Sequence, residues 1–301
     1  MRLNNCVSRV RGGCPPKASK HAEIIERIRD LERCLRESFQ LQGIISNDPR
    51  IADFANQLAH CESWAKRWKK LLKVASRLPR TDILFWIQEA ARRGDLDEAV
   101  WRGFLAGHFG RASTEDPGVV VSSAKFLMGF GQQPYWTWGR ISSNPESLRI
   151  WLLEHHVELR SLSYGNHRKY ESQKPEILYR VFRSFLDWVA ENGGPPTVAF
   201  RLEVEESPES KFRLLFKSVG SIFRFRRTGT FDLLSLMGGM GLLPVRADSC
   251  YLRGSTGPMK GALKLWGRRP PRELSLLADA TAKALDIPYD IFEDALCMWQ
   301  K

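Results

Sequence analysis

Apolar residues recur at helical spacing along most of the chain. Between His21 and Gly43 they stand at positions 24, 28, 31, 35 and 39, a pattern typical of a helix with one buried face. The same spacing predicts a second helix from Asp48 to Leu78. A short apolar helix is expected from Phe231 to Met237, and the chain closes with two more over 271–285 and 288–299.

Polar caps and prolines mark where other helices begin. Asp82 and Asp95 each precede a periodic apolar segment, and a carboxylate there can accept a free helical N–H. Further helices are expected after Asn144-Pro145, around Pro175 and after Ser207-Pro208, since proline at the first helical position loses no hydrogen bond.

Only residues 197–205, TVAFRLEVE, alternate regularly enough to predict a strand, and one strand does not make a sheet. The sequence therefore predicts an all-α fold of about a dozen helices without an internal repeat. No apolar run approaches the roughly 20 residues that a bilayer crossing requires.

Charge divides the chain unevenly. The formal net charge is +12, and residues 1–94 hold 19 Lys and Arg against 10 Asp and Glu, which leaves +3 for the remainder. Such an excess favours an anionic partner, DNA or RNA rather than a membrane, and a solvated basic surface is the alternative. Residues 64–73, WAKRWKKLLK, fit a phosphate backbone or a helix with buried tryptophans.

The change in charge near Gly94 predicts a division into a flexible basic arm at 1–20, an N-terminal helical extension at 21–94 and a catalytic domain at 95–301. The arm lacks the apolar core of a secretory signal. The six cysteines are scattered without a CxxC pair, which indicates reduced thiols in a cytoplasmic protein and no metal site or cofactor.

The segment 218–265 combines the features that point most clearly to chemistry. Residues 211–227 carry six Lys and Arg and no acid, and they lead into the 231–237 helix. A glycine-rich bend at Gly238, Gly239 and Gly241 follows, and Asp248 stands after it. Cations can hold a phosphate backbone while a carboxylate faces the sugar of an extruded base.

The segment IFRFRRTGTFDLLSLMGGMGLLPVRADSCYLRG resembles the hairpin, helix and catalytic aspartate of the helix-hairpin-helix DNA glycosylase superfamily. The motifs WRGFLAGHFGR, YGNHRKYES, RADSCYLRGSTGPMKGA and EDALCMWQK together resemble the α-glutamyl/putrescinyl-thymine pyrophosphorylases, the third clade especially, over roughly 95–301. That family is tied to phage DNA hypermodification, and some relatives resemble glycosylases that excise bulky modified bases in defence against phage.

The resemblance implies a catalytic role for Asp248, with Ser249 as the small hydroxyl residue that follows it. Arg226, Arg227 and Thr228 would open the helix and, with Arg224, hold DNA. The family hairpin is rich in glycine, whereas this chain has Phe223, Phe225 and arginines there, so guanidinium groups would replace amides in phosphate contacts. Arg227 takes the place of the Schiff-base lysine, which implies a monofunctional glycosylase without lyase activity.

In that mechanism Asp248 would stabilise positive charge on the deoxyribose and orient or deprotonate the attacking water. The alternative interpretation is that Asp248 caps a helix, because Asp-Ser between apolar segments is a common N-cap pattern. The two roles are compatible.

Three other segments supply candidate contacts. The loop 164–172 suits a wedge or a stacking wall for a flipped nucleotide, the segment 134–140 suits an aromatic pocket, and the loop 254–262 suits a DNA phosphate. A surface loop without a role is the alternative for the first segment and core packing is the alternative for the second. The third lacks the GxxxxGK(S/T) spacing of an NTPase phosphate loop, which disfavours that function. The candidate substrate-binding residues are His167, Tyr164, Asn166, Tyr170, Trp136, Trp138 and His108, and the further DNA-binding candidates are Arg168, Lys169, Ser255, Thr256 and Lys260.

Three functions remain open. The leading hypothesis is a monofunctional DNA glycosylase that excises a hypermodified or glycosylated pyrimidine from double-stranded phage DNA in anti-phage defence. The second is a transferase that displaces pyrophosphate or phosphate on modified 5-hydroxymethyluracil with an amine. The third is a DNA-binding module without catalysis.

Overall fold

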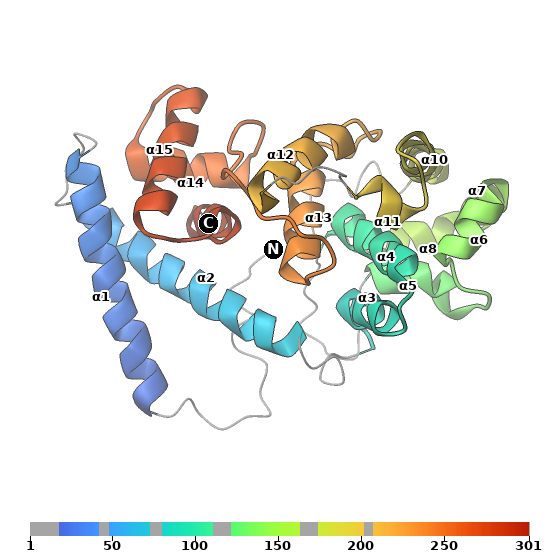
Figure 1. Cartoon of the computed structure of the whole chain (residues 1–301), viewed down its shortest axis with the longest axis horizontal. Helices are drawn as coiled ribbons and strands as arrows, with labels where there is room; N and C mark the ends of the chain where they lie inside the picture. The colour runs from blue at the N-terminus through green and yellow to red at the C-terminus, as the bar shows by residue number, and fades with distance from the viewer. Residues whose placement is uncertain are drawn as a thin grey trace. The chain divides into compact units, whose positions relative to one another are not determined.

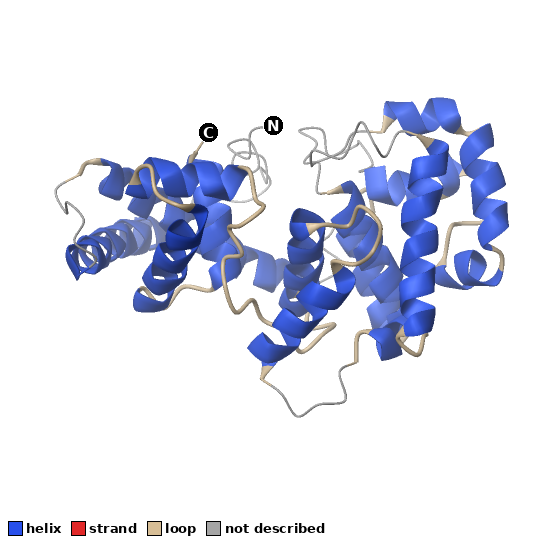
Figure 2. Ribbon diagram, turned by 90° about the horizontal axis from the view of Figure 1, so that it is seen from above, coloured by secondary structure: helices blue, strands red, loops and turns tan. Residues whose placement is uncertain are grey.

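The computed structural model describes residues 18–41, 48–72, 80–110, 122–162, 174–201 and 207–300. Every regular element in these ranges is a helix (Figure 2), which confirms the predicted all-α class. The helices, in chain order (Figure 1), are α1 Ala18–Leu41, α2 Arg50–Leu72, α3 Ile83–Arg92, α4 Leu96–Phe109, α5 Ser122–Leu127, the 3-10 helix η3 Gly129–Gly131, α6 Trp138–Ser143, α7 Pro145–Glu154, α8 His156–Ser161, α10 Pro175–Glu191, α11 Pro196–Ala199, α12 Pro208–Val219, α13 Arg227–Gly239, α14 Gly257–Trp266, α15 Pro271–Ala284 and α16 Tyr289–Trp299.

The predicted helix starts are confirmed by their caps. Asp82, Asp95, Asn144 and Ser207 each accept a backbone N–H from the first turn of the helix that follows. Prolines occupy the first turn of α7, α10 and α12, as expected. These boundaries were predictable because a cap acts only within a few residues of itself.

The predicted strand over 197–205 is wrong where the structure describes it, because residues 197–199 lie in α11. Pro196 begins this short helix, and Asp97 Oδ1 accepts both the backbone N–H of Thr197, at 2.8 Å, and its hydroxyl, at 2.6 Å. A carboxylate 100 residues away thus caps a helix that local alternation does not reveal.

The chain divides into two compact units. The first spans Leu71–Arg246, and the second combines residues within Val7–Lys70 with Ala247–Lys301. Gly94, where a boundary was predicted, lies inside the first unit, in the turn between α3 and α4, which pack against each other. A change in surface charge does not interrupt the apolar faces that hold neighbouring helices together.

Helix α4 is the centre of the first unit. Every residue from Glu98 to Phe109 is buried, so the helix is covered on all sides. Its Phe104 ring stacks on Phe185 at 4.0 Å and on Phe225 at 4.8 Å between centroids. Aromatic contacts of this kind join α4 to α10 and to the loop before α13.

The second unit has its own core, in which N-terminal and C-terminal helices contribute side chains to one buried cluster. Phe54 of α2 packs edge-on against Phe292 and Trp299 of α16, with centroids 5.4 and 5.3 Å apart. Phe39 of α1 contacts Trp266 of α14 at 5.8 Å. The first two long helices are therefore core elements of this unit.

Candidate functional site

The polypeptide reaches Asp248 through a tight bend. Helix α13 ends at Gly239, and Gly241 has a φ of +72°, which favours glycine. Gly238 packs so closely that an added Cβ would lie 2.3 Å from the carbonyl oxygen of Val245. The bend therefore depends on Gly238 and Gly241.

The carboxylate of Asp248 is half-buried, and it accepts a hydrogen bond of 2.7 Å from the hydroxyl of Tyr251. Tyr251 has a φ of +47°, a conformation that non-glycine residues rarely adopt. Such strain persists only where the surroundings impose it, and it gathers at functional sites. Asp248 is thus neither sealed in the core nor fully open to solvent.

A second carboxylate, Asp279 of α15, holds the turn that carries Asp248. Its Oδ2 accepts the hydroxyl of Ser249 at 2.9 Å, and its Oδ1 accepts the backbone N–H of Cys250 at 2.7 Å. Burial raises the pKa of Asp279, which outweighs these two hydrogen bonds, and the nearby charge of Asp248 acts in the same direction.

Sequence reasoning missed Asp279 and Tyr251. The available signal was an acid inside an apolar helical pattern, since Ala278 and Ala282 on either side of Asp279 are buried. Ser249, predicted to contact DNA, instead directs its proton to Asp279, and its Oγ accepts the N–H of Tyr251 at 3.1 Å. The hydrogen bonds among Ser249, Tyr251 and Asp279 therefore stabilise the turn that carries Asp248.

The loop that follows leads into α14. The hydroxyl of Ser255 donates to the carbonyl of Leu252 at 2.7 Å, so this predicted DNA contact is engaged within its own turn. Thr256 and Lys260 are exposed, as is Arg253. Two cations and a hydroxyl therefore stand on the surface of the same unit as Asp248.

The predicted DNA-binding segment lies in the first unit. Arg226 and Thr228 are exposed at the start of α13, and the guanidinium of Arg227 lies 4.6 Å from the ring centroid of Phe231. Arg224 has a φ of +58°, and Phe225 beside it is fully buried. The loop therefore makes a positive-φ turn at a residue other than glycine.

Two predicted substrate contacts are core residues. Trp136 is 0% exposed and its indole N–H donates to no described residue, while the guanidinium of Arg140 covers its ring at 3.6 Å. His108 is 1% exposed and packs against Phe109 and Phe182. We correct both assignments, because neither ring is accessible to an extruded base in this conformation.

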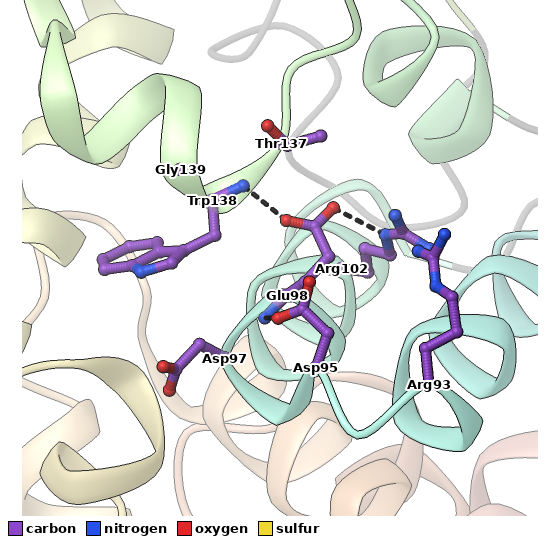
Figure 3. Close-up of a pocket in the computed structure, with 8 residues that line it drawn as sticks. All are labelled: Arg93, Asp95, Asp97, Glu98, Arg102, Thr137, Trp138 and Gly139. Carbon is purple, nitrogen blue, oxygen red and sulfur yellow. Dashed lines mark hydrogen bonds and ion pairs between the residues drawn. The ribbon is translucent and has the colours of Figure 1, made fainter.

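Trp138 remains at a surface, where it lines a hollow of about 340 Å³ (Figure 3). Glu98 lies at the centre of this hollow. It accepts the backbone N–H of Trp138 and pairs with Arg102 at 2.7 Å, and both partners of the ion pair are buried. Arg102 also pairs with Glu89 of α3 at 3.1 Å.

The three acids that line this hollow all have structural roles. Asp95 caps α4, Asp97 caps α11, and Glu98 joins α4 to α6. A buried ion pair of this kind fixes how helices meet rather than supplying a reactive group. We therefore assign the hollow to the architecture of the first unit.

The remaining predicted contacts, Tyr164, Asn166, His167, Arg168, Lys169 and Tyr170, lie outside the described residues. Within the described ranges, no group of three His, Cys, Asp or Glu residues is placed to hold a metal ion. No helix there is both long and apolar enough to cross a bilayer.

The segment around Asp248 lies within a longer stretch of the chain that matches the model of a described protein family. The model of the alpha-glutamyl/putrescinyl thymine pyrophosphorylase clade 3 family matches residues 59–301. The chain belongs to this family. Neither the curated proteins nor the solved structures compared with the chain give a match.

The pyrophosphorylase match confirms the predicted family and extends further towards the N-terminus than the expected 95–301. It takes in both sites, namely the turn of Asp248 and the arginines before α13, and it leaves out α1. The family description names thymine and a pyrophosphorylase activity, so an enzyme acting on thymine fits better than a hydrolytic glycosylase.

Proposed function

We propose that this protein exchanges a pyrophosphate on a modified thymine in DNA for an amine, with Asp248 as the general base. The observation that carries the proposal is the half-buried Asp248 carboxylate, which Tyr251 and the Asp279-bound turn hold in place. The family description supports it, because glutamate and putrescine, whose groups it names, both carry an amine that can act as the nucleophile.

The reaction needs a base because only the neutral amine has a lone pair for attack. The ammonium group gives one proton to the carboxylate of Asp248. The freed nitrogen then bonds to the exocyclic methylene carbon of the base, and the bond from that carbon to the pyrophosphate oxygen breaks. Pyrophosphate leaves with the electron pair, so no oxidant or reductant is required.

The leaving group carries several negative charges, and cations lower the cost of its departure. Arg253 and Lys260 are exposed in the same unit as Asp248 and are suited to this role, together with the hydroxyl of Thr256. Ser249 and Ser255 are less suited, since their protons are already donated within the protein.

A monofunctional glycosylase is the second candidate, and the same Asp248 carboxylate favours it. Here Asp248 would take a proton from water while the water oxygen bonds to the sugar carbon. The glycosidic bond would break, and the base would leave with the electron pair and then take up a proton. Arg227 at the start of α13 agrees with the absence of a lyase step, because arginine stays protonated.

One assay separates these functions. The full chain is incubated with duplexes that carry thymine, 5-hydroxymethyluracil, its pyrophosphate ester or a glycosylated pyrimidine, with glutamate or putrescine present. Mass spectrometry of the nucleosides detects an amine adduct, and alkali cleavage detects abasic sites. We expect an adduct with pyrophosphate release, whereas abasic sites would support the glycosylase and binding alone would indicate a DNA-binding module.

The variant Asp248→Asn tests the proposed base. We expect a loss of at least about 100-fold in rate, which is the usual contribution of a positioned base. Asp286→Asn is the matched control, because Asp286 is exposed in the same unit and its φ of +51° is one that asparagine tolerates. Full activity in Asp248→Asn would exclude the carboxylate as the base.

A further inference from the structure

We propose that a hollow on α10, beside the loop that precedes α13, binds a phosphodiester group of the DNA substrate. This α10 hollow is lined by Tyr179, Arg180, Arg183, Ser184, Asp187 and Phe223. The inference rests on DNA as the substrate in the proposed function. It adds a backbone contact from a helix that no sequence motif pointed to.

The volume of the α10 hollow is about 260 Å³. Pockets for drug-sized ligands measure roughly 300–1,000 Å³. The α10 hollow is therefore suited to one group of a longer molecule, such as a phosphodiester, rather than to a free nucleotide.

Positive charge gathers around one aromatic ring at this hollow. The guanidinium of Arg180 lies 4.3 Å from the ring centroid of Phe223, and that of Arg224 lies 5.4 Å from the same centroid. Arg180 is exposed, and among the described residues it pairs with no carboxylate. A bound phosphate would accept charge-assisted hydrogen bonds from the guanidinium of Arg180.

One carboxylate lies in the hollow, and it is already paired. Asp187 Oδ1 accepts a hydrogen bond of 2.9 Å from Nε of Arg183, one turn earlier on α10. This ion pair removes most of the repulsion that Asp187 would exert on an anion. The exposed guanidinium group of Arg180 then sets the sign of the potential in the hollow.

The backbone of the loop that carries Phe223 and Arg224 is held in place by its neighbours before any ligand binds. Ile222 and Phe225 are buried on either side of Phe223 and Arg224, and the N–H of Phe223 donates to Oγ of Ser184 at 2.9 Å. Arg224 takes its positive φ between these two anchors. A loop whose backbone is already fixed loses less entropy on binding, which favours a binding site at this position.

The test is binding of a short unmodified duplex to the full chain, measured by fluorescence anisotropy over a series of salt concentrations. We expect Arg180→Ala and Arg224→Ala each to weaken binding about tenfold, the effect of losing one charge-assisted hydrogen bond. Each should also reduce the slope of log affinity against log salt by about one. Arg201→Ala, an exposed arginine outside the hollow, is the control and should change neither.

Three outcomes would overturn the inference. The first is binding by Arg180→Ala that equals the control. The second is a weaker affinity with an unchanged salt slope, since that would indicate altered packing. The third is displacement of DNA by inorganic phosphate beyond the effect of chloride at equal ionic strength, which would indicate a site for free phosphate.

The assay requires neither a modified base nor turnover, so its result is independent of the chemistry at Asp248. A reduced salt slope without any reaction would support the hollow and count against the proposed enzyme. A reaction that depends on Asp248, together with unchanged binding in Arg180→Ala, would support the proposed enzyme and contradict the α10 hollow. Should Arg224→Ala fold poorly, Arg180→Ala alone decides, because its side chain is exposed.

Discussion

Tyr251 and Arg224 share a backbone conformation that costs a non-glycine residue about 1–2 kcal/mol. Each stands in a segment where we place function, the first beside the Asp248 carboxylate and the second at the α10 hollow. Buried or anchored neighbours impose the conformation in both cases. At the scale of the residue, the packing of neighbouring residues therefore fixes the backbone at these two positions.

Asp279 gives a prediction for stability against pH. Burial raises its pKa in the folded protein above the ordinary value of 3.8, so the folded state holds this proton more tightly than the unfolded state does. Its contribution to stability is therefore present below pH 3.8 and is lost as the pH rises through the folded pKa. Asp279→Asn removes this contribution.

Denaturant unfolding of both proteins from about pH 4 to 7 measures the effect. The free energy of unfolding of the wild type minus that of Asp279→Asn should fall as the pH rises above 3.8. Asp286→Asn, at an exposed acid, serves as the control. Parallel curves for wild type and Asp279→Asn would show that the carboxyl keeps an ordinary pKa.

At the scale of the element, close approach between helices depends on a few glycines. Gly103 and Gly107 of α4 face α13, where an added Cβ would meet side chains of Met237 and Leu233. Gly261 of α14 faces α16 even more closely, because an added Cβ would lie 2.1 Å from the backbone oxygen of Leu296. Backbone cannot move aside as a side chain can.

Gly261→Ala should therefore destabilise the protein by about 1–3 kcal/mol, the usual cost of overpacking. Gly239→Ala is the matched control, because nothing lies within 4 Å of its added Cβ and alanine favours a helix. Thermal unfolding of the two variants measures the difference. A melting temperature for Gly261→Ala equal to that of Gly239→Ala would contradict the tight contact between α14 and α16.

At the scale of the whole molecule, α1 and α2 belong to a core that the C-terminal helices complete. Leu31, Leu35 and Phe39 of α1 are buried in the same cluster as Leu274 and Ala278 of α15. Asp248 and Asp279 lie in this unit as well. The part of the predicted N-terminal extension that forms α1 and most of α2 is thus structurally tied to the unit that carries the candidate base.

Deleting residues 1–58 tests this dependence, since it leaves the family-matched segment 59–301 intact. The deletion uncovers Phe292 and Trp299, which now pack against Phe54. We expect loss of cooperative unfolding or aggregation, because several buried side chains worth about 1.5–3 kcal/mol each lose their partners. A deletion variant with the wild-type melting temperature would show that the C-terminal helices fold without α1 and α2.

The sequence by itself determined the helical class, the helix starts and the family. These features can be recognised from the sequence because each acts over only a few residues. They are caps such as Asp82 and Asn144, prolines in first turns and the apolar period. Asp248 was also predictable as a candidate, because its motif is contiguous. The same local reasoning misplaced residues 197–199, whose cap comes from Asp97.

Only the tertiary structure decided which groups meet. Asp279 reaches Ser249 across 30 residues of sequence, and Arg180 reaches Phe223 from a separate helix. It also decided which aromatic residues are core, since Trp136 and Trp138 stand two positions apart and only the first is fully buried. Contacts of this kind depend on how apolar faces pack between residues far apart in the sequence. The local periodicity of the sequence does not predict that packing.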